Sequence, residues 1–127
     1  FKNKNVLIVD DSIVRGTTSK EIVQMAKDAG ANKVFFTSAA PPVRYPHVYG
    51  INMPNRDELI AHDKTISEIA DQLEIDSLIY QSVENLRKAI ISDSTIQDLE
   101  MSCFTGSYVT GTVNQEYLNW VENEYKS

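Results

Sequence analysis

Residues Val6–Thr18 read VLIVDDSIVRGTT and decide the fold of this chain. The run opens with four apolar residues, three of them β-branched, which predicts a strand buried on both faces at the centre of a parallel sheet. Two adjacent carboxylates, Asp10 and Asp11, end the strand, and a short loop containing Gly16 leads into a helical pattern. Strand, loop and helix in this order predict an α/β fold with a parallel sheet flanked by helices.

The loop after the strand has the composition of an anion-binding loop. Backbone N–H groups and the positive end of the helix dipole converge there, and the hydroxyls of Thr17 and Thr18 can donate to the same anion. Asp10 and Asp11 suit a cation or the vicinal hydroxyls of a sugar. Together these features predict a pocket for a ribose 5-phosphate.

Composition bounds the class of protein. The chain has 127 residues, of which 42% are apolar and 24% charged, as expected for one globular domain with a modest core. A net charge of −6 argues against non-specific nucleic-acid binding, which needs a basic surface. The single cysteine excludes an internal disulfide and favours a reducing compartment. Without a signal peptide or a membrane-length apolar run, we expect a cytoplasmic protein with no membrane partner.

The remaining pattern alternates between strands and helices. A helix is expected over 18–29, begun by a threonine cap with Glu21 near the capping-box position and stopped by Gly30. A parallel crossover over the first two strands would place the ligand at their carboxyl ends, beside the aspartates and Ser38. Further strands are predicted over 33–38 and 77–81, helices over 55–61, 65–73, 83–91 and 114–125, and short extended segments over 47–51 and 103–112.

The run 6–18 closely resembles the phosphoribosyl pyrophosphate (PRPP) signature of type I phosphoribosyltransferases, in the form found in the glutamine PRPP amidotransferase family. Further matches are Ser38–Tyr45, His47–Ile51, Met53–Pro54, Glu58–Ala61, Ile79–Gln81 and Cys103–Thr110. The resemblance implies a partial type I phosphoribosyltransferase-like fold with a carboxyl-terminal helical tail. Because the chain opens at Phe1 just before a core strand, we expect residues 1–127 to be a carboxyl-terminal fragment, with the core over about 1–82, the tail over about 83–127 and the glutaminase domain absent.

The resemblance also implies an activity, in which PRPP and glutamine-derived ammonia give 5-phosphoribosylamine in the first step of de novo purine biosynthesis. The implied cofactor is Mg²⁺, held by Asp10 and Asp11. Implied partners are PRPP, inhibitory purine nucleotides, the rest of the same polypeptide and further copies in a homo-oligomer, with no nucleic acid. The fragment itself is expected to be inactive, because its sequence shows no pyrophosphate loop, closing loop or ammonia source. The implied PRPP and nucleotide contacts are Asp10, Asp11, Ser12, Ile13, Val14, Arg15, Gly16, Thr17 and Thr18.

Two positions depart from the family pattern. Some members hold an iron–sulfur cluster with a Cys-x-x-Cys pair, but Glu100 stands at the first of these positions and Cys103 at the second. Since such clusters normally need four cysteines, we expect no iron–sulfur cluster here. Asn52 stands where the family usually has aspartate.

Two alternatives come from other classes. Residues 7–12 also resemble the first strand of a two-component receiver domain, but Gly50 occupies the place of the phosphoacceptor and Ala89 follows Lys88 where a proline is expected. A PRPP- or nucleotide-sensing regulatory module would keep the pocket and carry out no reaction. The binding motif alone does not separate this module from an enzyme.

Overall fold

The computed structural model describes residues 1–53 and 55–126. Pro54, part of the match Met53–Pro54, and Ser127 lie outside the described residues. The elements in chain order are β1 (Asn5–Asp10), α1 (Thr17–Asp28), β2 (Lys33–Ser38), η1 (Arg56–Glu58), α2 (Ile66–Leu73), β3 (Ser77–Tyr80), α3 (Val83–Ile91), α4 (Ser102–Thr105) and α5 (Gln115–Lys126). The predicted α/β class is confirmed.

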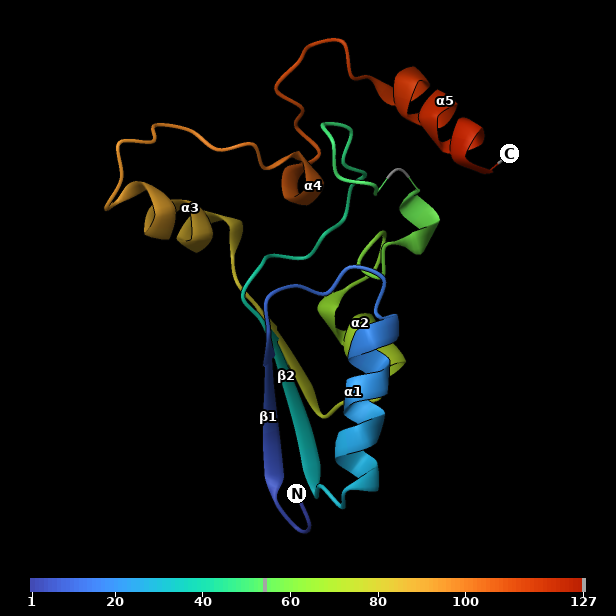
Figure 1. Cartoon of the computed structure of the whole chain (residues 1–127), viewed down its shortest axis with the longest axis vertical. Helices are drawn as coiled ribbons and strands as arrows, with labels where there is room; N and C mark the ends of the chain where they lie inside the picture. The colour runs from blue at the N-terminus through green and yellow to red at the C-terminus, as the bar shows by residue number, and fades with distance from the viewer. Residues whose placement is uncertain (54, 127) are drawn as a thin grey trace.

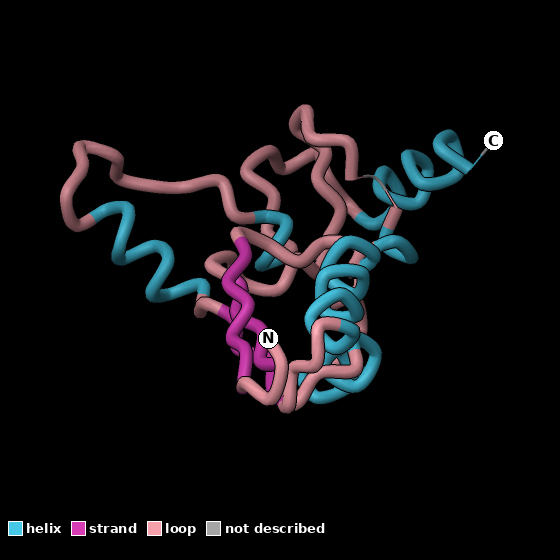
Figure 2. Tube along the Cα trace, turned by 60° about the horizontal axis from the view of Figure 1, so that its bottom comes forward, coloured by secondary structure: helices cyan, strands magenta, loops and turns pink. Residues whose placement is uncertain are grey.

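The three strands form one parallel sheet in the order β1-β2-β3. Helices α1 and α2 pack on the same side of it, α1 against β2 and α2 against β3 (Figures 1 and 2). The elements after β3 lie beyond the carboxyl ends of the strands (Figure 1). In a receiver-type sheet the first strand lies between the second and third, so this order disfavours the receiver alternative.

The hydrophobic core fills the space between the sheet and its two helices. Its most buried members include Val23 of α1, Phe36 of β2 and Ile69 of α2, each at most 1% exposed. Ile13, from the loop after β1, is buried in the same core at 1%. The start of the loop is therefore held by the core itself, which fixes the position of the residues that follow.

Strand β1 corrects one prediction. It lies at the edge of the described sheet, and Leu7 and Val9 are 57% and 71% exposed, so the prediction of a central strand buried on both faces was wrong. The side chains of a strand alternate between faces, and only the face toward α1 and α2 is covered in the described part of the chain.

The two ends of α1 test the predicted start and stop of this helix. Helix α1 begins after Gly16 without a side-chain cap, so the threonine cap predicted for α1 was wrong, whereas α2 begins with a capping box formed by Thr65 and Glu68. Gly30 ends α1 as predicted: it has a φ of +84°, its N–H donates to Lys27 O, and the next N–H donates to Ala26 O.

The second half of the chain differs more from the sequence prediction. The helix expected over 55–61 is the single turn η1, capped by Asn55, and the segment 47–51 contributes only an isolated bridge from His47 to Met53. The extended segment expected over 103–112 begins inside the helical turn α4. Helices α3 and α5 form as predicted, and α3 has no buried residue.

Candidate functional site

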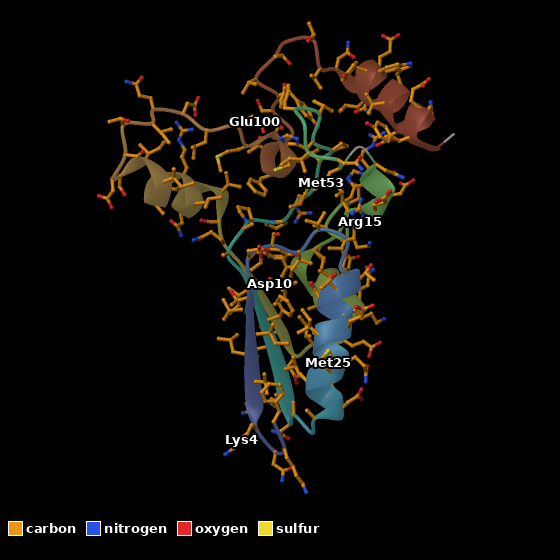
Figure 3. The ribbon with its side chains drawn as sticks, viewed as in Figure 1. Lys4, Asp10, Arg15, Met25, Met53 and Glu100 are labelled. Carbon is orange, nitrogen blue, oxygen red and sulfur yellow. The ribbon has the colours of Figure 1, made fainter. Side chains whose placement is uncertain are left out.

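The acidic pair lies where β1 ends, at the carboxyl edge of the sheet. Asp10 is the last residue of β1 and is in register with Ser38 of β2, which in turn pairs with Tyr80 of β3. Figure 3 shows Asp10 at this end of the strand, with Arg15 above the start of α1. Backbone bonds continue past the strand, because Asp10 O accepts from Ala39 N at 2.9 Å and Asp11 O from Ala40 N at 2.8 Å.

The two carboxylates are ordered by local hydrogen bonds. Asp11 N–H donates to Asp10 Oδ1 at 2.9 Å, and the Ser12 hydroxyl donates to Asp11 Oδ1 at 2.9 Å. Asp10 is half-buried and Asp11 is exposed. Each bond engages one oxygen of its carboxylate, so the pair can still accept hydrogen bonds from sugar hydroxyls or share a cation with a ligand.

The loop reaches α1 through a glycine that the structure requires. Gly16 has a φ of +79°, a left-handed conformation that side chains rarely adopt. A Cβ added there would lie 2.4 Å from Ile60 Cδ1, so the Ile60 side chain packs too closely against the loop to leave room for a side chain at this position. The Ile60 N–H also donates to Val14 O at 2.9 Å, which ties the loop to the chain ahead of α2.

Helix α1 offers its uncapped N-terminus to this loop. The Lys20 N–H bonds to Gly16 O at 2.9 Å, while the N–H groups before it have no carbonyl within the helix. The first turn has no acidic residue, and Thr17 and Thr18 are exposed beside it. Free donors at the positive end of a 12-residue helix suit a phosphate group.

These groups surround one open cavity of about 350 Å³. The side chain of Ile13 faces the core instead, so of this predicted contact only the backbone is available to a ligand. Ser19, which the sequence analysis missed, lines the cavity and is 4% exposed; its position after two threonines in the first helical turn was the available signal. The lining residues are Asp10, Asp11, Ser12, Val14, Arg15, Gly16, Thr17, Thr18 and Ser19.

Asp10 and Asp11 are the candidate metal ligands. Within the described residues there is no group of three or more His, Cys, Asp or Glu side chains placed to hold a metal ion. Mg²⁺ is commonly held by one or two carboxylates together with substrate phosphates and water. The pair therefore fits a cation that is shared with a bound phosphate ester, and not a metal site built from protein ligands alone.

Cys103 is set away from the sheet, in α4. Burial, and secondly the charge of Glu100, raise the pKa of its thiol, which keeps it protonated at neutral pH. Glu100 is paired with His47, with 3.4 Å between Oε2 and Nε2. The carbonyl of Cys103 accepts hydrogen bonds from the N–H groups of Arg44 and Tyr45, and these two bonds tie α4 to the segment that follows β2.

Solved structures identify the class of fold. The chain superposes with a TM-score of 0.79 and 40% identity on a Bacillus subtilis glutamine PRPP amidotransferase complexed with ADP and GMP, covering 90% of this chain and 26% of that one. A second structure, described as the allosteric regulatory enzyme of purine biosynthesis, gives a TM-score of 0.80 at 39% identity and covers 95% of this chain and 26% of that one. The chain has a type I phosphoribosyltransferase fold.

Comparison with related sequences shows which phosphoribosyltransferases the chain resembles. The chain is homologous to amidophosphoribosyltransferases: it is 52% identical over 125 residues to that of Haemophilus influenzae, 50% over 123 to that of Escherichia coli and 51% over 127 to that of Saccharomyces cerevisiae. These matches cover 98%, 96% and 100% of this chain and 25%, 24% and 24% of the relatives, so the chain spans about a quarter of their length. No family model matches. No helix in the described part of the chain is long and apolar enough to cross a membrane.

Proposed function

We propose that this chain forms the ribose 5-phosphate-binding part of an amidophosphoribosyltransferase. In that reaction the nitrogen of ammonia bonds to the anomeric carbon of PRPP while the bond from that carbon to the pyrophosphate oxygen breaks and pyrophosphate leaves; loss of one proton from the nitrogen to solvent then gives 5-phosphoribosylamine. The observation that carries the proposal is the loop over residues 10–18, where paired carboxylates and an uncapped helix N-terminus line one cavity. An activity-free sensing module would use the same pocket, and the similarity to named enzymes over nearly the whole chain favours the enzyme.

Each part of the loop has a role in this proposal. The N–H groups of residues 13–18 and the threonine hydroxyls hold the 5-phosphate, and Asp10 and Asp11 accept from the ribose hydroxyls. Positive charge grows on the ribose ring as pyrophosphate leaves, and the nearby carboxylates stabilise it. Asp10 and Asp11 are also the residues that would hold Mg²⁺, which when bound neutralises charge on the pyrophosphate.

The proposal extends to the partners of the site. The B. subtilis relative was solved with ADP and GMP. Purine nucleotides carry the same ribose 5-phosphate as PRPP, so they would compete for this pocket. We further propose that the longer protein is a cytoplasmic homo-oligomer in which a glutaminase domain supplies ammonia.

Ligand binding by the 127-residue chain tests the site directly. Titration with ribose 5-phosphate should shift the amide resonances of residues 13–18 in ¹⁵N-correlated spectra, and Asp10→Asn should weaken binding. Asp98→Asn is the matched control, because Asp98 pairs with Arg87, is 78% exposed and lines neither cavity at the loop. Ligand-induced shifts elsewhere, with the loop resonances unchanged at saturation, would reject the site.

Turnover is tested in a chimaera in which this chain replaces the matching segment of the E. coli relative, to which it is 50% identical. Asp10→Asn or Asp11→Asn should lower PRPP-dependent turnover about a hundredfold, or ~3 kcal/mol, because a charge near the developing cation is lost. A loss below about threefold for both variants would contradict the role of the acids. The 127-residue chain alone, given PRPP, Mg²⁺ and ammonia, should release no pyrophosphate.

A further inference from the structure

Arg15 is held by a carboxylate from a distant part of the chain. Its Nε donates to Oε2 of Glu58, which lies 43 residues downstream at the end of η1. Arg15 lines the cavity of about 350 Å³ at the loop and also a neighbouring cavity of about 260 Å³ between α1 and α2. Figure 3 shows it above the start of α1, on the side of the molecule where η1 lies.

The segment that carries Glu58 is held in place by burial and by hydrogen bonds. The residues after it, Leu59, Ile60 and Ala61, are 3%, 3% and 0% exposed, and the Asn55 side chain caps the turn by accepting from Asp57 N at 3.0 Å. The same segment holds the loop at two more points, through Ile60 N–H to Val14 O and through the contact between Ile60 and Gly16. The position of Glu58 relative to the loop is therefore set by packing and backbone bonds.

The chemistry of the pair leaves Arg15 able to bind a ligand. A guanidinium has five N–H donors, and the contact with Glu58 uses the one on Nε. The Nη donors can then meet a phosphate, which guanidinium groups recognise through paired charge-assisted hydrogen bonds. An arginine held in place loses less side-chain entropy on binding than a free one. The side chains of Arg15 and Glu58 are 52% and 44% exposed. Solvent therefore weakens the electrostatic repulsion between the Glu58 carboxylate and a bound phosphate.

We propose that Glu58 is a positioning residue for phosphate recognition. It holds Arg15 at the rim of the cavity so that the free guanidinium N–H groups bind the 5-phosphate of the ligand. This inference rests on the proposed function, because it assumes that the loop binds a phosphorylated ribose. It makes the site selective for phosphomonoesters, through a residue that does not touch the ligand.

The experiment is a double-mutant cycle on the 127-residue chain, with ribose 5-phosphate and unphosphorylated ribose as probes in calorimetric or NMR titrations. Arg15→Gln should weaken ribose 5-phosphate binding about tenfold, and Glu58→Gln about threefold. The double variant should bind as Arg15→Gln does, because Glu58 acts only through Arg15. Ribose binding should not change in any of them.

Glu74→Gln is the matched control. Glu74 pairs with two lysines of α1, Lys20, which lines the neighbouring cavity, and Lys27, so the variant makes the same change in net charge beside α1 without touching Arg15. We expect it to leave ribose 5-phosphate binding unchanged. Circular dichroism and thermal melting confirm that each variant is folded. The Arg15 Nε–H resonance should shift on ligand addition in the wild type, and in Glu58→Gln it should move to the chemical shift of an arginine that has no carboxylate partner.

The two proposals fail in different ways. If the wild-type chain shows no binding of ribose 5-phosphate at the loop, the proposed function fails. If the wild type binds and Glu58→Gln binds as tightly or more tightly, Glu58 does not position Arg15. Additive losses in the double variant, or an equal loss in Glu74→Gln, would also overturn the inference, because they would show a general electrostatic effect.

Discussion

The part of the chain up to the end of β3 and the part after it are stabilised by different interactions. The first part packs α1 and α2 on the sheet around side chains such as Phe36 and Ile69, which are fully buried. In the second part, α3 has no buried residue, and Trp120 of α5 is 57% exposed. Met101, Leu118 and Val121 are buried as well, at 8%, 8% and 9% exposure, but apolar burial contributes more to the first part than to the second, where polar contacts carry a larger share.

The contact between α5 and the rest of the molecule shows this difference. Arg56 of η1 donates to both carboxylate oxygens of Glu122, through Nε at 2.6 Å and Nη2 at 3.0 Å, and through Nη2 to Asn119 Oδ1 at 2.8 Å. The hydrogen bond with Glu122 raises the pKa of Arg56. The Glu122 side chain is 10% exposed, so water screens this pair less than it screens the surface pairs of α3. The candidate site belongs to the first part, where its geometry is fixed by the core.

The largest expected effect is in the core. Phe36→Ala should lower the free energy of unfolding by about 3–5 kcal/mol, because it leaves a cavity at a fully buried position. Ile90→Ala, in α3, is the control, since Ile90 is 37% exposed, and should cost less than about 1 kcal/mol. Urea denaturation measures both. Similar losses in the two variants would show that α3 shares the core's stability and would remove the contrast.

An intermediate effect is expected at α5. Glu122→Gln keeps the shape of the side chain but removes the charge that pairs with Arg56, and should lower the local stability of α5 by about 2 kcal/mol. Amide hydrogen exchange should become faster at Leu118, whose N–H bonds to Asn114 O, and stay unchanged in β2.

The control for this change is Glu84→Gln in α3. Its pair with Lys88 is short, at 2.7 Å, but both side chains are at least 70% exposed, and its loss should be below about 0.5 kcal/mol. Faster exchange throughout the molecule after Glu122→Gln would mean that α5 and the core unfold together. The division into two differently stabilised parts would then be wrong.

The parts of the fold that sequence patterns predicted are those with local signals. The bounds of β2 follow from its apolar run, and the start of α2 follows from Thr65 and Glu68, only three residues apart. The aspartates and the loop after them were likewise readable as a ligand site, because strand, acids and helix follow one another directly.

What could not be predicted depends on contacts between distant residues. Two contacts join segments more than 40 residues apart: Glu58 with Arg15, and Ile60 with Gly16. No local sequence pattern predicts either of them. The exposed outer face of β1 has the same cause: an apolar run shows that a strand can be buried, while the elements packed on it decide whether it is.

The smallest expected effect separates two tyrosines, one in each part. Burial raises the pKa of both Tyr80 and Tyr108 to about 12. The Tyr108 hydroxyl donates to Pro46 O at 2.7 Å, whereas the Tyr80 hydroxyl, in β3, is buried without a partner in the described part of the chain. At pH 7, Tyr108→Phe should therefore lower the free energy of unfolding by about 1 kcal/mol, while Tyr80→Phe should leave it unchanged or raise it by up to about 1 kcal/mol.

The pH dependence sharpens this comparison. A tyrosine whose folded pKa is about 12, against about 10 unfolded, keeps its proton longer when folded, so stability is unaffected below pH 10 and falls as the pH rises toward 12. In urea titrations run from pH 8 to pH 11.5, either phenylalanine variant should reduce the decrease in the free energy of unfolding with rising pH. Each variant should remove the part of the decrease that comes from its own tyrosine. If Tyr80→Phe lowers stability at pH 7 as much as Tyr108→Phe does, the Tyr80 hydroxyl is hydrogen-bonded in solution, and the packing at the end of β3 is more polar than the structure shows.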